Sequence, residues 1–321
     1  MTRINLGWYG FLVALALLPT ALPGVFTNGF DVHVMILVLL YASMAQAWNL
    51  IGGYGGQVSF GHSVFFGLGA YGAAMALVTY HGSPWVGALV GSLVAAGAAV
   101  IISYPCFRLK GHYFAIATFA IVEIFNRLFM MWNWVGGALG LDYPLLEEGW
   151  KNFMWFDTKV PYYYGALGLF AVVFGVVRWV DGHRLGAWLR AVREGQEAAE
   201  SLGVNSARVK LVALAISAFL AGLCGAFFAQ YNYRVDPPMV MSLDMAMKFV
   251  LISILGGVGT FWGPLVGAAI LMPLQEYTRA AWGGVGGGVD LIIFGVLIIF
   301  VVTRQPQGVV GFIGHVFRRK G

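Results

Sequence analysis

Few residues in this sequence have a type and spacing that could do chemistry, and most of them lie inside or beside apolar segments. Glu123 lies near the middle of an apolar run, and Arg127 follows four residues later, a spacing that favours an ion pair along one helix face. An intramembrane carboxylate usually faces protein or water rather than lipid. The pair could therefore be a structural ion pair inside a bundle or a contact for a substrate.

A second group of polar residues lies in a glycine-rich stretch. Gln57 and Ser59 stand among Gly52–Gly61 between two apolar runs, a composition that breaks a helix and frees backbone polar groups. Irregular backbone at membrane depth is tolerated where it lines a cavity, so we expect a broken or re-entrant segment near 52–61, with a flexible cytosolic turn as the alternative. A similar break is expected near 255–263, and two breaks in opposite halves of the chain point to a central path.

Sequence motifs for enzymatic catalysis and for nucleotide binding are missing. No lysine follows a glycine, so the sequence holds no phosphate-binding loop of the G-x-x-x-x-G-K type. Gly67, Gly69 and Gly72 spell G-x-G-x-x-G, but no strand is expected before them and no acidic residue occurs between Asp31 and Glu123. The histidines show no metal-ligand spacing, and no serine, histidine and acid are grouped. We expect no enzyme activity, metal or cofactor in this chain, so any ATP would be hydrolysed by another subunit.

The composition is that of a polytopic membrane protein. Hydrophobic residues make up 60% of the chain and charged residues 10%, whereas a soluble domain typically carries about a quarter charged residues. The net charge of +5 comes from arginine and lysine in short loops, and no basic run with interleaved aromatic residues indicates nucleic acid. Cys106 and Cys224 lie in apolar runs and are expected to be packing residues.

Apolar runs of roughly 17 to 25 residues give about ten membrane spans and an all-α polytopic helical bundle. The expected spans are Gly7–Leu22, Val32–Ile51, His62–Tyr80, Pro84–Phe107, Tyr113–Trp132, Tyr162–Val180, Val209–Gln230, Leu243–Val258, Pro264–Ala280 and Asp290–Val302.

The distribution of lysine and arginine sets the expected orientation. Arg178–Lys210 is the longest polar passage and carries many cations, which places it on the cytoplasmic side. An even number of spans puts both termini on that side as well, in agreement with Arg3 and the basic residues near the C-terminus. We expect residues 1–321 to form a single permease domain, with a cytosolic docking loop at 181–208 and an extracytoplasmic loop at 132–161.

The docking loop carries an amphipathic pattern. Leu189, Val192, Ala198, Ala199 and Leu202 recur at helical spacing within 187–202, which predicts one amphipathic helix whose apolar stripe could meet a partner. Residues 197–203 spell E-A-A-x-x-x-G, which resembles the loop that permease subunits of ABC importers dock into their ATPase subunits. A solvated helix on the membrane surface is the alternative.

Four segments together resemble the LivM-type permeases of high-affinity branched-chain amino acid ABC importers. They are Trp48–Tyr71, Arg108–Glu123, Arg193–Gln230 and Val250–Ala268, and Arg304–Gly311 is similar to the end of the family. The resemblance implies a transport subunit in the bacterial inner membrane with four kinds of partner: a second homologous permease, two ATPases that bind ATP and magnesium, an extracytoplasmic substrate-binding protein, and the lipid bilayer. It implies ATPase docking at Arg193, Glu194, Glu197, Ala198, Ala199 and Gly203.

The translocation path is expected at the interface with the second permease. A small polar solute crossing hydrocarbon needs replacement hydrogen-bond partners, which freed backbone and uncharged polar groups supply. We expect Gln57, Ser59 and Gly61 to line the path, with exposed backbone at Gly256 and Gly257. Glu123 is the second choice.

Branched-chain or other hydrophobic amino acids are the expected substrates. Val135, Gly136, Gly137 and Gly140 keep the glycines of a family motif but lack its threonine, and wider relatives carry urea, short amides or aromatic acids, so these solutes remain alternatives. An ion-coupled secondary transporter is the rival class, although it would more often show several mid-span carboxylates.

The expected orientation predicts which side of the membrane reaches residue 201. In a Ser201→Cys variant, a membrane-impermeant thiol reagent should label the protein from the cytosolic side, because the docking loop is expected there. Labelling from the outer side alone would contradict the orientation.

Overall fold

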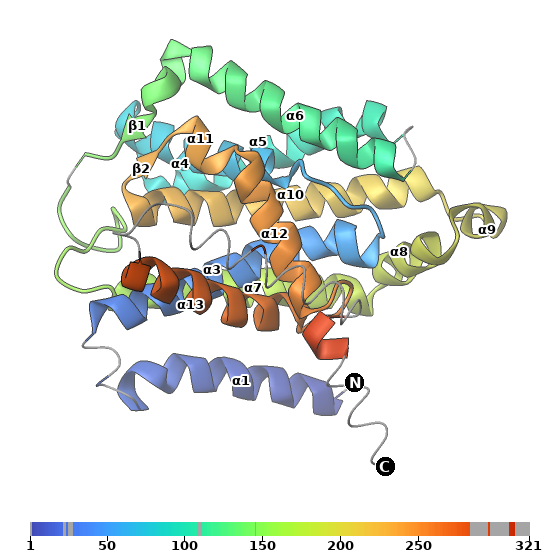
Figure 1. Ribbon diagram of the computed structural model, residues 1–321, viewed down its shortest axis with the longest axis horizontal. Helices are drawn as coiled ribbons and strands as arrows, with labels where there is room; N and C mark the ends of the chain where they lie inside the picture. Colours follow the sequence, from blue (N-terminus) through green and yellow to red (C-terminus); the bar gives the residue numbers. More distant parts are fainter. Residues whose placement is uncertain are drawn as a thin grey trace.

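Apolar runs of membrane-spanning length become helices in the computed structural model (Figure 1). The structure describes residues 2–21, 24, 28–107, 111–144, 146–282, 295 and 308–311. Every expected span except the last coincides with a helix, and the last, at 290–302, falls outside the described residues apart from residue 295. The long helices are α1 (Thr2–Ala21), α3 (Gly29–Asn49), α4 (His62–Val78), α5 (Pro84–Cys106), α6 (His112–Met131), α7 (Val160–Gly182), α10 (Ser206–Asn232), α12 (Leu243–Gly256) and α13 (Gly263–Trp282).

The all-α polytopic bundle predicted from the sequence is confirmed, although the number ten is not. Within the described residues, six helices are long and apolar enough to cross a membrane. Side-chain oxygens of Asn28, Asn205 and Ser242 accept hydrogen bonds from backbone N–H groups in the first turns of α3, α10 and α12. Such caps satisfy donors that a helix start leaves unpaired, so these polar residues fix where the helices begin.

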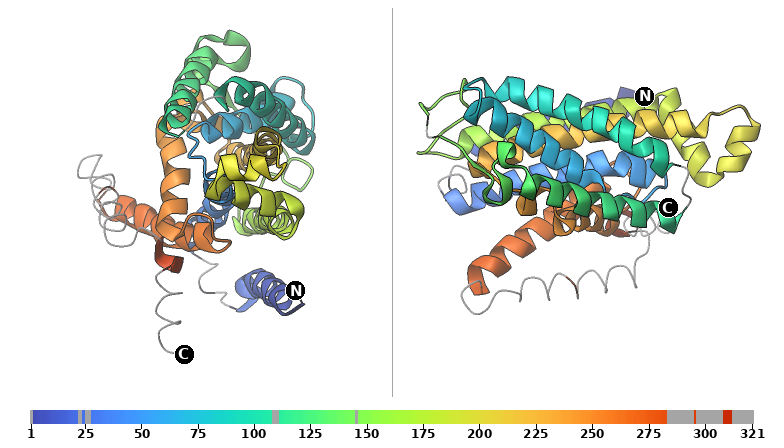
Figure 2. Two further views of the ribbon diagram at one scale, coloured as in Figure 1. Left: turned by 90° about the vertical axis from the view of Figure 1, so that its right-hand side faces the viewer. Right: turned by 90° about the horizontal axis from the view of Figure 1, so that it is seen from above.

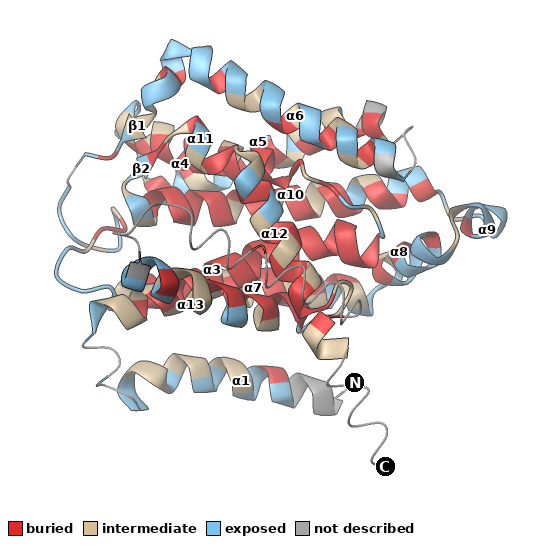
Figure 3. Cartoon of the chain, in the orientation of Figure 1, coloured by how far each residue is buried: buried red, intermediate tan, exposed pale blue. Residues whose placement is uncertain are grey.

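Helix α3 lies at the centre of the bundle and α6 at its edge. In the most apolar stretch of α3, 89% of the residues are buried within the chain, against 22% for α6. Figure 3 shows the buried core running through α3, α7 and α10, with α6 exposed on the outside. The exposed side of α6 carries large apolar residues, which identifies it as a surface for lipid or for another membrane protein.

Glycines allow α4, α5 and α10 to approach closely. A Cβ atom at Gly69 would overlap the backbone of Gly222, and one at Gly225 would overlap the carbonyl oxygen of Phe66. A Cβ atom at Gly72 would lie only 2.4 Å from the Cα atom of Gly91 in α5. The G-x-G-x-x-G match at 67–72 is therefore a helix-packing face, and the small-residue pattern serves packing within the chain.

The loop at 132–161 closes one end of the bundle. It contains η2 (Asn133–Val135), η3 (Gly137–Leu139) and β1 (Leu141–Asp142), which pairs antiparallel with β2 (Arg234–Val235) after α10. Gly136 and Gly140 have φ values of +88° and +75°, which a residue with a side chain rarely adopts. These glycines have a turn-forming role that requires no neighbouring hydroxyl group.

The docking loop projects from the opposite end of the bundle as two short helices (Figures 1 and 2). They are α8 (Arg184–Glu194) and α9 (Gln196–Ser201), and the prediction of one continuous amphipathic helix over 187–202 was wrong. Gly195 between them has an extended backbone with φ of −174°. Glycine favours this break because its flexible backbone gives it a low helix propensity.

The glycine contacts predict a difference between two matched substitutions. Gly225→Ala should destabilise the bundle by about 1–3 kcal/mol, because the added methyl overlaps the Phe66 carbonyl at a site with no room to relax. Gly168→Ala in α7, where no atom lies within 4 Å of the added Cβ, should leave stability unchanged or raise it. Thermal unfolding of the purified protein in detergent measures both, and equal melting temperatures would contradict the packing account.

Candidate functional site

The first broken segment follows directly from α3. The chain passes from Asn49 into a π-helical turn, η1 (Leu50–Tyr54), and is irregular from Gly55 to Gly61. Trp48 Nε1 donates to the carbonyl of Ser59 at 2.6 Å, and Ser59 Oγ accepts from the N–H of Gly61 at 3.2 Å. The broken segment expected near 52–61 is confirmed from Gly55 onward, and its polar groups fold it back against α3.

The second broken segment joins α12 to α13. Gly257 and Gly259 have φ values of +128° and +79°, and Thr260 Oγ1 donates to the Gly257 carbonyl at 2.8 Å. The same hydroxyl accepts from the N–H of Gly263 at 3.1 Å, where α13 begins. The break expected near 255–263 is confirmed at 257–262.

Asn49 fastens the two broken segments together. Its Oδ1 accepts from the N–H of Gly259 at 2.8 Å, and its Nδ2 donates to the carbonyl of Thr260 at 3.0 Å. A Cβ at Gly53 would lie 2.5 Å from the Gly259 nitrogen, so only glycine permits this approach. Asn49 and Gly259 are 210 residues apart in the sequence, so the two broken segments form one structural unit from distant parts of the chain. We name the unit of 49–61 and 257–262 the junction.

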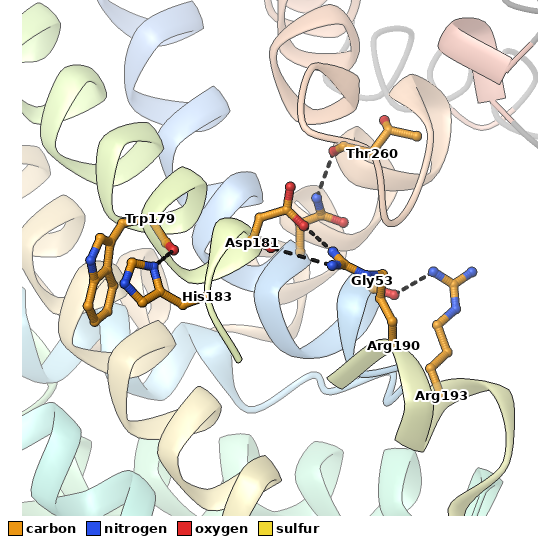
Figure 4. A network of polar contacts seen from close by, with 8 residues as sticks. Gly53, Trp179, Asp181, His183, Arg190, Arg193 and Thr260 are labelled. Carbon is orange, nitrogen blue, oxygen red and sulfur yellow. Dashed lines mark hydrogen bonds and ion pairs between the residues drawn. The ribbon is translucent and has the colours of Figure 1, made fainter. Parts of the chain in front are cut away.

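Arg193 at the end of α8 reaches into the junction. Its Nη1 donates to the carbonyl of Gly53 at 2.7 Å, as Figure 4 shows. A Cβ at Gly56 would lie 2.8 Å from Arg193 Cγ, and a Cβ at Gly259 would lie 2.4 Å from Arg193 Nη1. The last carbonyls of a helix lack intrahelical partners, and Arg193 satisfies that of Gly53 with a charged donor. Arg193, which the resemblance assigns to ATPase docking, thus also connects the docking loop to the junction within this chain.

Two further polar contacts hold the docking helices on the bundle. Arg190 donates to Asp181 at the end of α7, which fixes α8 (Figure 4). Lys210 Nζ donates to Gln196 Oε1 at 2.9 Å, which fixes the start of α9 against α10. The docking loop is therefore part of the folded bundle rather than a free loop.

The remaining docking residues divide into an inner and an outer set. Ala199 is buried in its own chain together with Leu189 and Val192, so this part of the predicted apolar stripe packs inward on the bundle. Leu202 is 86% exposed. Glu194, Glu197, Ala198 and Gly203 are exposed and remain the predicted docking surface.

Gly203 is constrained by its backbone and not by close neighbours. Its φ is +87°, while no atom lies within 4 Å of an added Cβ. A side chain at this position would strain the turn between α9 and α10 rather than clash.

A cavity of about 780 Å³ lies between the docking helices and the first broken segment. Its walls come from the broken segment, the start of α6, the ends of α8 and α9 that meet at Gly195, and Lys210. The lining residues are Gly55, Gly56, Gln57, Val58, Phe60, Gly111, Phe114, Ala115, Val192, Arg193, Gly195, Gln196, Glu197, Ala198 and Lys210. We call it the docking-loop cavity.

The residues predicted to line a path are not brought to one place. Gln57 lines the docking-loop cavity, whereas Ser59 and Gly61 are buried, with their polar groups paired to each other. Gly256 and Gly257 are also buried, since Gly263 packs on the first and Gly308 on the second. The prediction that the backbone of these two glycines is exposed was wrong for this conformation, because neighbouring glycine backbones cover the end of the helix.

Glu123 lies on the outer face of α6 and makes no hydrogen bond to the junction among those of the described residues. Its Oε1 accepts from Arg127 Nε at 2.7 Å, and the two side chains are 55% and 71% exposed. The predicted ion pair is therefore present, but it is not buried in the bundle of this chain. On the same helix, Thr118 Oγ1 accepts from the N–H of Phe60 at 3.1 Å, which connects α6 to the first broken segment.

Sequence reasoning missed the buried polar residues that hold the core. Asn49 stood alone at the end of an apolar run and had no spacing that singled it out. His62 Nε2 lies 2.7 Å from Ser217 Oγ, and Ser217 donates to the carbonyl of Ala47, so α4, α10 and α3 share one hydrogen-bonded chain. A lone polar residue next to glycines was the only available signal.

The helical bundle, its docking helices and its junction define a polytopic permease. A sequence model of the family described as branched-chain amino acid transport system / permease component matches residues 32–302. The chain belongs to this family.

Named relatives agree with that assignment. The "High-affinity branched-chain amino acid transport system permease protein LivM" of Escherichia coli K12 is 28% identical over 320 residues, covering 93% of this chain and 74% of the relative. Protein BraD of Pseudomonas aeruginosa, a permease named for the same kind of system, is 24% identical over 289 residues, covering 84% and 91%. Protein LivH of E. coli K12 is 24% identical over 293 residues, covering 84% and 91%. No solved structure matches significantly.

The contact between Arg193 and Gly53 predicts a loss of coupling. Arg193→Ala should lower substrate uptake by about tenfold or more while ATP hydrolysis persists, because it removes a charged hydrogen bond worth roughly 1.5–3 kcal/mol. Arg184→Ala is the matched control, since Arg184 is an exposed arginine on the same helix and makes no hydrogen bond to the junction among those of the described residues. Parallel loss of uptake and hydrolysis in both variants would show a general folding defect and contradict a specific role for Arg193.

Proposed function

We propose that this chain is a permease subunit of an ATP-binding-cassette importer for branched-chain or other hydrophobic amino acids. It would form the translocation path with a second, related permease and carry no ATPase activity of its own. Two separate ATPase subunits would bind ATP and magnesium and dock on the outer set of the docking loop. An extracytoplasmic binding protein would deliver the substrate to the 132–161 side.

One observation carries this proposal beyond family membership, namely that the docking helices are tied to both broken segments. A movement imposed on α8 by an ATPase would be passed through Arg193 to Gly53 and, through Asn49, to the turn at Gly259. Rigid elements joined by satisfied hydrogen bonds are suited to transmit such a displacement. A chain that lacks a phosphate-binding loop but has such a connection is suited to receive work from a partner.

The orientation follows from the same assignment. Docking on ATPases would place the loop at 181–208 and both termini in the cytosol of a bacterium, with the bundle as a single domain in the inner membrane. The loop at 132–161 lies at the opposite end of the bundle, which supports its assignment to the extracytoplasmic side (Figure 1).

The outer face of α6 is the best candidate for the surface shared with the second permease. Glu123 lies near the middle of α6 and Arg127 about one turn nearer its end, and both are exposed in the isolated chain. Each charge at the bilayer centre costs about 2.5–3.5 kcal/mol, so water or protein rather than lipid should cover them. A path at this interface, with Glu123 on its wall, removes that cost.

Two alternative functions differ from the proposed one, the first in its substrate and the second in its source of energy. Urea, short amides or aromatic acids could pass through the same architecture, and the names of the relatives favour amino acids over them. A secondary transporter would couple uptake to an ion gradient, and no role for the docking helices would then remain.

Reconstitution tests the proposal directly. Proteoliposomes holding this chain with its partner permease, ATPases and binding protein should accumulate radiolabelled leucine, isoleucine or valine only when ATP is supplied on the ATPase side. Urea, acetamide and benzoate are the comparison solutes. Accumulation that is driven by an ion gradient and needs no ATPase would overturn the proposal.

A charge swap separates two roles for Glu123. Glu123→Gln should lower uptake by about tenfold in transporters that still assemble and hydrolyse ATP, since an unpaired Arg127 is left on the path wall. The swap Glu123→Arg with Arg127→Glu restores an ion pair on α6. If Glu123 faces the path, as proposed, the swap does not restore uptake, whereas full recovery would assign it a structural role with Arg127 only.

A further inference from the structure

The docking-loop cavity has features that coupling alone does not require. Its volume of about 780 Å³ lies within the range of ligand-binding pockets, roughly 300–1,000 Å³. Its walls belong to three parts of the chain: the docking helices and the first broken segment, which the proposed mechanism requires to move, and the start of α6. A molecule bound there would contact all three at once.

The polar walls can recognise both charges of a zwitterion. Arg193 and Lys210 line the cavity, and Lys210 is only 6% exposed. Helix α6 starts at the cavity, and no side chain in the described part of the chain caps its N-terminus at Gly111, so its first N–H groups add a partial positive charge. These donors suit a carboxylate.

Acceptors for an ammonium group lie on the same cavity. The carboxylate of Glu197 lines it, and the buried Oε1 of Gln57 has no hydrogen-bond partner among the described residues. A buried acceptor without a donor costs about 1–3 kcal/mol, so a small rotation of Gln57 toward an ammonium donor is favourable.

The remaining wall is apolar. Val58, Phe60 and Phe114 also line the cavity. A branched aliphatic side chain fits this lining, whereas an inorganic anion or a lipid headgroup leaves it unused.

We propose that the docking-loop cavity binds a free amino acid with a short apolar side chain from the cytosol, and that its occupancy slows the transporter. The inference rests on the proposed function, because it takes the transported amino acid as the ligand. A ligand that binds one arrangement of the docking helices, broken segment and α6 stabilises that arrangement against the others. Accumulated substrate would thereby reduce its own import.

Protection of an introduced thiol tests binding. Val58 is exposed at the cavity, and both native cysteines are buried, so a thiol reagent should label a Val58→Cys variant selectively. In inside-out vesicles holding the complete transporter, leucine at ten times its dissociation constant should slow labelling by about tenfold. The analogues 4-methylpentanoate and 3-methylbutylamine lack one charge each and should not protect.

ATP hydrolysis tests the regulatory role. Leucine added to inside-out vesicles should slow hydrolysis by the unmodified transporter, and Ala115→Phe, which fills the cavity, should abolish this response. Ala207→Phe adds the same group to an exposed position outside the cavity and should keep it. Each variant is compared with its own rate without leucine.

The outcomes separate this inference from the proposed function. Equal protection by 4-methylpentanoate would show a general carboxylate site, and no protection at any leucine concentration would show no site, so either result overturns the inference. Protection without slower hydrolysis overturns the regulatory role. Proteoliposomes that import leucine normally while these tests fail refute this inference alone, whereas absent import refutes the proposed function.

Discussion

The hydrogen bond from Arg193 to the carbonyl of Gly53 is the contact on which the functional architecture depends. The π-helical end of α3 leaves a carbonyl without an intrahelical partner in a buried turn, where an unpaired acceptor costs about 1–3 kcal/mol. The guanidinium of Arg193 in α8 donates to this carbonyl and thereby removes that cost. The docking loop therefore cannot leave the bundle without exposing an unsatisfied group at the junction.

Glycine allows the junction to form, and the junction does not tolerate a side chain in place of these glycines. Gly53 meets the Gly259 backbone at a distance that excludes any side chain, and the α12 to α13 turn needs backbone angles that other residues rarely adopt. Asn49 then satisfies a donor and an acceptor of that turn with one amide. Short, fully paired contacts of this kind behave as one rigid body, which is the property a coupling element requires.

The sequence predicted the elements better than it predicted their contacts. Apolar runs located the helices because span length is set by the bilayer, and glycine clusters located both breaks because glycine disrupts helices. The contact of Arg193 with Gly53 and the contacts of Asn49 with the second broken segment join distant parts of the chain. Asn49 and Gly259, for example, are 210 residues apart in the sequence, and no local pattern encodes their meeting. Ala199 had the spacing of a partner-facing stripe, yet it packs on its own bundle.

The most direct test of the account is whether the docking loop and the junction move together. Spin labels at Glu194→Cys and Val258→Cys report the distance between α8 and the second broken segment in the assembled transporter. A second pair, at Glu194→Cys and the exposed Val86→Cys, reports the distance from α8 to the end of α5 that contacts the 132–161 loop. The account predicts that the first distance stays constant between the nucleotide-free and ATP-bound states while the second changes. A first distance that changes with ATP would contradict it.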